Sequence, residues 1–237
     1  MESEQLRVLA DMDYETLASL YLNNHFIFCP GPSTELELKP GLSALVTGGS
    51  SGIGKALVVA LAQKGIFSTI IDLSEEKGKE VASLTETEFL KFSVKPEFPA
   101  VLFIKCDVTD TNEIKAAFRK HIDTYGGLDI CINCAGIGSS IPFDEDRTDG
   151  GKSWRLTVNV NLIAVIGCTQ IAIQKMQETR KPGVIINVAS ASGLYPLYTD
   201  PIYSGSKGGV ILFTRSLALY KHQGIRINAL CPEVLLS

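Results

Sequence analysis

Short apolar runs alternate with stretches of helical spacing along most of this chain. The runs are rich in β-branched residues and almost lack polar alternation, which is typical of parallel strands that helices cover on both faces. Strands that alternate with helices predict an α/β fold, a doubly wound parallel sheet in three layers with about six strands. The six predicted strands are Ser43 to Thr47, Ser68 to Asp72, Val101 to Asp107, Leu128 to Asn133, Val184 to Val188 and Ile225 to Leu230.

Two segments do not fit the alternation. Residues 1–38 are expected to be an N-terminal appendage, in which Gln5 to Leu22 has the spacing of an amphipathic helix and Cys29 to Ser33 breaks the chain. Thr85 to Pro99 holds two prolines and mixed charge, so we expect a long loop there. Residues 39–237 are then one nucleotide-binding domain, since single sheets of this class reach such lengths.

Composition narrows the classes of partner and compartment. Of the 237 residues, 45% are apolar, and 26 acidic against 22 basic residues give a net charge of −4 with no long run of either sign. Such a balance argues against a nucleic-acid partner. No apolar run, such as Ala56 to Ala62, approaches the roughly 18 residues of a membrane span, and Met1 to Ala10 lacks the features of a secretion signal. We therefore expect a cytoplasmic protein that does not bind membranes.

The six cysteines are expected to be reduced residues of apolar segments. Cys131 and Cys134 form a C-x-x-C pair, but a second pair for zinc is missing from the sequence. We therefore predict no metal site.

The first strand leads directly into a glycine-rich turn, Thr47 to Gly54, before a helix that Gly65 would end. Glycine permits positive φ and lets a diphosphate approach the backbone, and the following helix N-terminus favours an anion. The turn between strand and helix thus predicts a Rossmann-like nucleotide site. Its predicted cofactor-binding residues are Gly48, Ser50, Ser51, Gly52, Ile53 and Gly54.

Asp72 ends the second strand, 24 residues after Gly48, near the usual spacing of about 20. A carboxylate at this position can accept hydrogen bonds from both adenosine ribose hydroxyls and repels the 2′-phosphate of NADP. No Arg or Lys stands in the glycine turn or directly after Asp72, so we expect NAD as the cofactor rather than NADP. The alternative is that Asp72 is a plain turn residue.

Tyr203 and Lys207 lie four residues apart and share one face of a helix, if the segment is helical. Gly205, Gly208 and Gly209 each cost about 1 kcal/mol relative to alanine in a helix interior. Such a conflict is typical of a site where a cofactor or a partner helix packs closely. We therefore expect catalytic residues here.

A phenol is protonated at neutral pH, so a tyrosine that acts as a base needs positive charge nearby. The Lys207 ammonium and a cationic nicotinamide would supply that charge. Ser190 lies 13 residues before Tyr203, at the end of a predicted strand, and its hydroxyl could hydrogen-bond the substrate oxygen. Ser192 is the alternative for this role.

The chain resembles the short-chain dehydrogenase/reductase family from about Leu38 to its end. The motifs that carry the resemblance are Thr47 to Gly54, Asp107-Val108, Asn133 to Gly136, Asn161, Ser190, Tyr203 and Lys207. The resemblance implies that Asp107 and Val108 contact the adenine and that Asn133, Ala135 and Gly136 pass close to the cofactor. It also implies that Asn161 holds a water of a proton relay through its backbone, with Asn159 as the alternative.

Several segments, among them Ser190 to Leu194 and Ile225 to Pro232, are most similar to the NAD-dependent 15-hydroxyprostaglandin dehydrogenase branch. The resemblance implies hydride transfer between NAD(H) and a secondary alcohol or ketone, lipid-like ones included, and a homodimer or homotetramer. Residues Trp154 to Glu178 and Tyr203 to Lys221 would form long helices of the subunit contact.

Three departures from the family pattern stand out. Glu233 follows Pro232 where relatives have glycine, and Cys134 replaces a more usual asparagine. The sequence stops at Ser237, where relatives continue with a substrate-covering helix pair and a seventh strand, so we expect a C-terminally truncated domain.

Two other functions compete with a dehydrogenase. The first is an NAD(P)-binding module, or one domain of a larger oxidoreductase, with lost or incomplete catalysis. The second is an adenosylmethionine-dependent methyltransferase, which leaves Ser190, Tyr203 and Lys207 unexplained.

Overall fold

A computed structural model describes residues 36–92, 98–139 and 141–233. Its centre is a six-stranded, all-parallel sheet in the order β3-β2-β1-β4-β5-β6. The strands are β1 (Ser43–Thr47), β2 (Phe67–Asp72), β3 (Val101–Lys105), β4 (Ile130–Asn133), β5 (Gly183–Val188) and β6 (Ile225–Leu230). The predicted doubly wound, Rossmann-like sheet is confirmed, and each predicted strand agrees with an observed one to within two residues.

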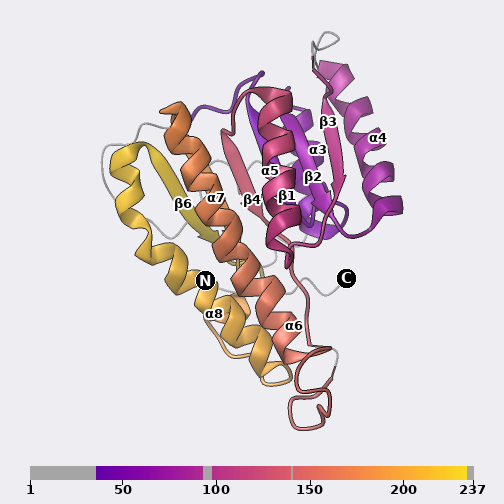
Figure 1. Cartoon of the computed structure of the whole chain (residues 1–237), viewed down its shortest axis with the longest axis vertical. Coiled ribbons are helices and arrows are strands. Elements are labelled where there is room, and N and C mark those ends of the chain that lie inside the picture. Colours follow the sequence, from indigo (N-terminus) through magenta and orange to yellow (C-terminus); the bar gives the residue numbers. More distant parts are fainter. Residues whose placement is uncertain (1–35, 93–97, 140, 234–237) are drawn as a thin grey trace, which may run out of the picture.

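Helices connect the strands and cover both faces of the sheet, so the molecule has three layers (Figure 1). One face packs against α3 and α4, and the other against α5, α7 and α8. The helices are α3 (Gly52–Ala62), α4 (Glu75–Phe92), α5 (Thr111–Tyr125), α6 (Trp154–Val158), the π-helical turn η1 (Asn159–Ile163), α7 (Ala164–Thr179), the 3₁₀ turn η2 (Ala191–Gly193), α8 (Pro201–Ser216) and the 3₁₀ turn η3 (Ala218–Gln223).

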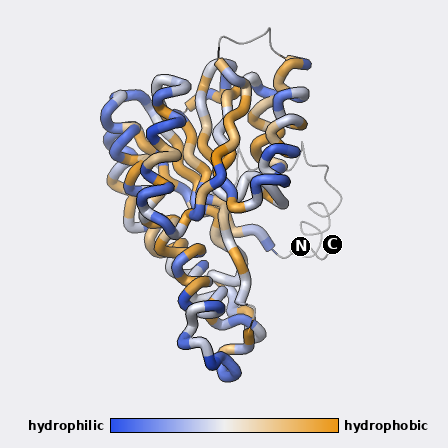
Figure 2. Tube along the Cα trace, turned by 45° about the vertical axis from the view of Figure 1, so that its right-hand side comes forward, coloured by the Kyte–Doolittle hydropathy of each residue, from blue (hydrophilic) through white to orange (hydrophobic). Residues whose placement is uncertain are grey.

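The apolar strands form the core between these layers, as the hydropathy of the chain shows (Figure 2). Leu45 of β1 faces the α5 and α7 layer, where it meets Phe118 and Met176. Its neighbours in the same strand, Ala44 and Val46, face the α3 and α4 layer. Because successive residues of a strand point to opposite faces, a buried strand must be apolar throughout.

The prediction of a long loop over Thr85 to Pro99 is wrong for its first half. Helix α4 continues to Phe92, and residues 93–97 lie outside the described residues. Thr85 and Phe89 are fully buried four residues apart on the inner face of the helix, and the Phe89 ring stacks on Phe67 at a centroid distance of 5.3 Å. This burial stabilises α4, a mostly polar helix with a narrow apolar face.

The segment predicted as one long helix, Trp154 to Glu178, is helical throughout but contains a π turn between α6 and α7. The run from Trp154 to Thr179 is long and apolar enough to cross a membrane, although polar residues interrupt it. Half of an 18-residue apolar stretch within this run is buried inside the protein, however, with Ala172, Ile173 and Met176 in the core. A core helix of a three-layer fold explains this composition.

The second predicted long helix, Tyr203 to Lys221, is also divided, into α8 and the 3₁₀ turn η3. Helix α3 ends at Ala62, and Gly65, with φ of +69°, reverses the chain so that the Ile66 N–H donates to the Leu61 carbonyl. The predicted helix from Gln5 to Leu22 lies outside the described residues. Leu36 and Leu38, at the end of the expected appendage, pack against the α3 and α4 face of the sheet.

Candidate active site

A cavity of about 680 Å³ lies at the carboxyl edge of the sheet, the edge where ligands bind in doubly wound folds. The segments that follow all six strands contribute to its wall. Its lining residues are Gly48, Ser51, Gly52, Ile53, Gly54, Ile71, Asp72, Leu73, Cys106, Asp107, Val108, Cys134, Ala135, Gly136, Ile137, Gly138, Leu156, Val160, Val188, Ala189, Ser190, Tyr203, Lys207, Pro232 and Glu233.

The glycine turn forms the floor of the cavity between β1 and α3. Gly48 has φ of +66°, and a β-carbon on it would lie 2.7 Å from the Ala135 Cα. A β-carbon on Gly54 would collide with the Gly48 carbonyl. Within the described residues, the Ser51 side chain makes no capping bond to α3. The helix N-terminus therefore retains donors that can hold a phosphate, which the predicted role of this turn requires.

Asp72 lies at the cavity edge beyond the glycine turn. One carboxylate oxygen accepts from the Ser50 N–H at 3.1 Å and the other from the Ser74 N–H at 3.1 Å. Each oxygen keeps a further lone pair, so the group can still accept from ribose hydroxyls. The Ser50 side chain is buried and does not line the cavity, so only its backbone contributes here.

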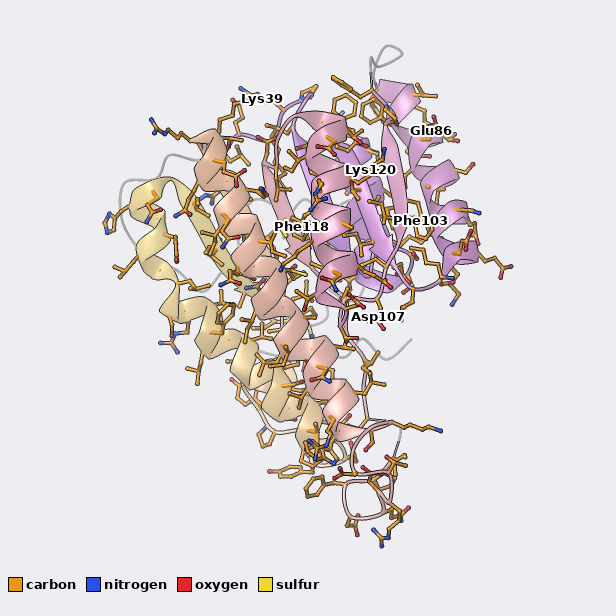
Figure 3. All side chains as sticks on the ribbon, in the orientation of Figure 1. Lys39, Glu86, Phe103, Asp107, Phe118 and Lys120 are labelled. Atoms are coloured by element: carbon orange, nitrogen blue, oxygen red, sulfur yellow. The ribbon has the colours of Figure 1, made fainter. Side chains whose placement is uncertain are left out.

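Asp107 and Val108, to which the resemblance assigns the adenine, line the cavity after β3. Figure 3 labels Asp107 below the strands, at their carboxyl ends. The Asp107 carboxylate accepts from the N–H and the hydroxyl of Thr109, both at 2.8 Å. Its own N–H donates to Glu113 at 2.7 Å. These bonds hold the short connection from β3 to α5 in a defined conformation at the end of the cavity that Asp72 also borders.

Ala135 and Gly136, which the resemblance places close to the cofactor, line the cavity after β4. The Thr47 hydroxyl oxygen accepts from the Cys134 N–H at 3.1 Å and the Ala135 N–H at 3.2 Å, which ties this turn to the end of β1.

Asn133 does not reach the cavity. Its amide nitrogen donates to Asn187 at 2.7 Å and to Thr169 at 3.1 Å in a fully buried network. Asn133 thus joins β4, β5 and α7, whereas the residues that follow it, Cys134 to Gly136, line the cavity.

Tyr203 and Lys207 lie in the first two turns of α8, and both line the cavity, as the four-residue spacing predicted. The Lys207 ammonium is 5.7 Å from the centroid of the Tyr203 ring and donates to the Val188 carbonyl at 2.8 Å. That carbonyl ends β5, so Lys207 also connects the helix to the sheet. A phenol and an ammonium therefore share one wall of the cavity.

Burial lowers the pKa of Lys207 from 10.5 to about 8, an effect that the nearby thiols of Cys134 and Cys231 oppose. Burial also raises the pKa of Cys134 to about 11, so the thiol is neutral near pH 7. Lys207 is thus the positive group of the inner wall, and a modest rise in pH would discharge it.

Ser190 lies beyond the end of β5, where its hydroxyl accepts from the Ser192 N–H at 3.1 Å. The same hydroxyl is 3.5 Å from the Pro232 carbonyl. Ser190 lines the cavity together with Tyr203, whereas Ser192 does not. Of the two alternatives, Ser190 therefore has the geometry that the predicted role requires.

Asn161 is fully buried at the centre of the π turn, whereas Asn159 is exposed. The Asn161 side chain does not line the cavity, because its amide bonds the N–H and the carbonyl of Ile137, both at 2.8 Å. π turns inside α-helices are frequent at functional sites because they disturb the regular backbone bonding.

Two of the three glycines of α8 are closely packed, as the unfavourable helix propensity of glycine predicted. Gly208 approaches the Gly193 carbonyl, and Gly209 packs beneath Leu162 of the π turn. Neighbouring elements rather than a ligand fill these positions. Gly205 differs, since a β-carbon there would meet no described atom within 4 Å.

Several cavity residues were missed by the sequence reasoning. Ile137, Leu156 and Val160 are apolar residues that line the cavity, and nothing in their local pattern distinguishes them from core residues. Among the described residues, no group of three or more histidines, cysteines and acids gathers as metal ligands would.

Comparisons with known proteins agree with this geometry. A family model described as short chain dehydrogenase matches residues 43–237. The human NAD(+)-dependent 15-hydroxyprostaglandin dehydrogenase is 36% identical over 197 residues, which cover 81% of this chain and 67% of that protein. A 3beta-hydroxysteroid dehydrogenase from Eggerthella lenta is 34% identical, with coverage of 81% and 70%.

Solved structures show the same architecture. A short chain dehydrogenase from Mycobacterium smegmatis has a TM-score of 0.73 and 27% identity over 87% of this chain and 82% of its own. Levodione reductase has a TM-score of 0.71 and 27% identity, with coverage of 82% and 72%. The chain therefore belongs to the short-chain dehydrogenase family of oxidoreductases.

Proposed function

We propose that this protein transfers hydride between NAD(H) and a secondary alcohol or ketone, with Tyr203 as the acid–base residue. The observation that carries the proposal is the meeting of Tyr203, Lys207 and Ser190 on the wall of the cavity that begins at the glycine turn. The cavity suits a dinucleotide because Gly48 and Gly54 let the backbone of the turn pack tightly, while Gly52, with φ of +47° and no described atom within 4 Å of its β-carbon, leaves open space for the diphosphate. When bound, the nicotinamide ring accepts or delivers the hydride.

The protein's own groups bind and orient the substrate and move the proton. The Tyr203 phenol would take the hydroxyl proton of the alcohol, and Ser190 would hold the substrate oxygen in reach of it. The Lys207 ammonium, held by the Val188 carbonyl, favours the ionised form of a neighbouring phenol. Asn161, through the backbone of its π turn, would connect Lys207 to solvent. The adenosine end would rest on Asp72, Asp107 and Val108.

The substrate is expected to be apolar around the reacting carbon. Ile137, Leu156 and Val160 line the same cavity as Tyr203, and Ile137 and Leu156 are both more than a third exposed. Apolar side chains exposed at a site gain free energy when an apolar ligand covers them. Relatives named for prostaglandin and steroid alcohols are consistent with a lipid-like substrate.

NAD is the expected cofactor because the Asp72 carboxylate would repel the additional phosphate of NADP. The relatives named above include an enzyme named for NAD(+). We expect NADP to bind at least tenfold more weakly than NAD, and Asp72→Ala to narrow this ratio about tenfold. Titration of the protein with each cofactor in its reduced form measures both affinities.

The test of the function is turnover of NAD with a panel of apolar secondary alcohols, compared between the wild type and Tyr203→Phe. Loss of the acid–base group should lower kcat by about 10² to 10⁴-fold, while NADH binds as before. Tyr195→Phe, at an exposed position that does not line the cavity, is the matched control and should leave kcat unchanged.

The main rival is a nucleotide-binding module without catalysis. Tight NADH binding with no turnover on any alcohol or ketone would favour the rival. Equal kcat in the wild type and Tyr203→Phe would refute the assigned role of the phenol.

A further inference from the structure

The Asp200 carboxylate joins two segments of the active site that are distant in sequence. One oxygen accepts from the Tyr203 N–H at 2.9 Å and so caps helix α8. The other oxygen accepts from the Ser139 N–H at 2.7 Å. Ser139 directly follows Gly136 to Gly138, which form the cavity wall after β4. One side chain thus contacts both the turn that carries the phenol and the end of the cavity wall that follows β4.

The same wall is held at its other end by Asn161, whose amide bonds both polar backbone groups of Ile137. The Asn161 nitrogen also donates to the Ser206 hydroxyl at 3.2 Å, and this hydroxyl donates to the Tyr203 carbonyl at 2.7 Å. These polar contacts, together with the backbone between Ile137 and Ser139, therefore form a closed ring. Its members, in order, are Ile137, Asn161, Ser206, Tyr203, Asp200 and Ser139.

The capping role alone does not explain both contacts. A serine, threonine or asparagine caps a helix as well as an aspartate, because one acceptor oxygen is sufficient. The second bond of Asp200 reaches a residue 61 positions away and is short, as expected for a charged acceptor. It closes the one side of the ring that no other described side chain spans.

We propose that Asp200 is a positioning residue that fixes the 136–139 wall relative to Tyr203. The inference rests on the proposed function, since this wall and the phenol line the same cavity, which would hold the nicotinamide and the substrate. Releasing Ser139 would let the wall move away while α8 stays capped. Cofactor affinity and turnover would then fall without loss of the fold.

Asp200→Ser and Asp200→Asn test this, because each keeps one acceptor oxygen for the cap and cannot accept both bonds. We expect amide exchange at Ser139 to accelerate while the Tyr203 amide remains protected. The Kd of NADH, measured by energy transfer from the single tryptophan, Trp154, should rise about fivefold, as for the loss of one hydrogen bond. Turnover should fall about tenfold, and the unfolding midpoint should stay within about 2 °C of the wild type.

Asp110→Ser is the matched control for the fold, because Asp110 caps α5 with one oxygen in the same way. It shows what this change of cap does to the unfolding midpoint. Asp200→Ala removes both bonds and should lower the midpoint as well as the affinity.

Two outcomes would overturn the inference alone. In one, Asp200→Ser binds NADH and turns over as the wild type does, although Ser139 exchanges faster. In the other, the affinity falls only in Asp200→Ala, in step with its midpoint, which would make Asp200 a helix cap and nothing more. Failure of the wild type to bind NADH would instead overturn the proposed function and this inference with it.

Discussion

At the scale of single residues, buried charge distinguishes the active site from the rest of the core. Lys207 is 3% exposed, and the only acceptor recorded for its ammonium within the described residues is the Val188 carbonyl. No carboxylate is among the causes of its pKa shift, which burial dominates. A cation buried without a counter-ion costs stability, and residues with such shifts cluster at functional sites.

The cost of burying Lys207 predicts how stability depends on pH. Between pH 8 and 10.5 the folded protein has a neutral Lys207, whereas the unfolded chain still binds the proton. Because the unfolded state binds more protons, the contribution of Lys207 to stability rises with pH across this window, on the order of 3 kcal/mol.

The measurement compares the wild type with Lys207→Met by denaturant unfolding at pH values from 7 to 10. The difference in unfolding free energy should be constant below pH 8 and shift in favour of the wild type above it. A difference that is independent of pH would show that the ammonium keeps its proton in the folded state. Lys115→Met, at an exposed position of α5, is the control and should give no such trend.

At the scale of elements, packing overrules helix propensity in α4. Gly78 lies inside this helix, where alanine would be favoured by about 1 kcal/mol. A β-carbon at Gly78 would collide with the Phe103 ring of β3, however. The close approach of α4 to the sheet at this point therefore depends on the missing side chain.

Gly78→Ala is accordingly expected to destabilise the protein by about 1–3 kcal/mol, the usual cost of overpacking. Gly167→Ala in α7 should do the opposite and stabilise by up to about 1 kcal/mol, since no described atom lies within 4 Å of its β-carbon. Thermal or denaturant unfolding of the two variants provides the comparison. Phe103→Leu should restore stability to Gly78→Ala, and failure to do so would assign the loss to another contact.

Packing between elements also explains why the loop prediction from Thr85 onward was wrong. The polar composition of α4 and the prolines beyond it indicated an irregular segment, whereas the fold provides a surface for its few apolar residues. Local sequence does not show that Phe89 will meet Phe67, 22 residues earlier in the chain.

At the scale of the whole molecule, apolar residues remain exposed on the layer that contains α7 and α8. Ile163, Leu212 and Leu219 are each more than half exposed. Exposed apolar side chains on adjacent helices are typical of a subunit contact. We expect a homodimer, or a homotetramer that contains this dimer, formed through these helices.

Sedimentation of the wild type should therefore give at least twice the 25.6 kDa mass of the chain. Leu212→Glu places a charge in the expected contact and should shift the protein to the monomer. Leu90→Glu, at a half-exposed position of α4 on the other face of the sheet, should leave the mass unchanged. A wild type that sediments as a monomer at every concentration would refute the contact.

The sequence by itself determined the order of the strands along the chain and the sheet class, and it predicted the residues of the site. The continuous apolar runs of the strands, the glycine turn and the Tyr203–Lys207 spacing are local patterns, and each depends on backbone geometry within a few residues. Only the tertiary structure decided which residues face the cavity. Asn133 and Asn161 turn into buried networks, while Ile137, Leu156 and Val160 border the site. The physical reason is that burial and long-range hydrogen bonds, such as Asp200 to Ser139, exist only after distant segments have packed together.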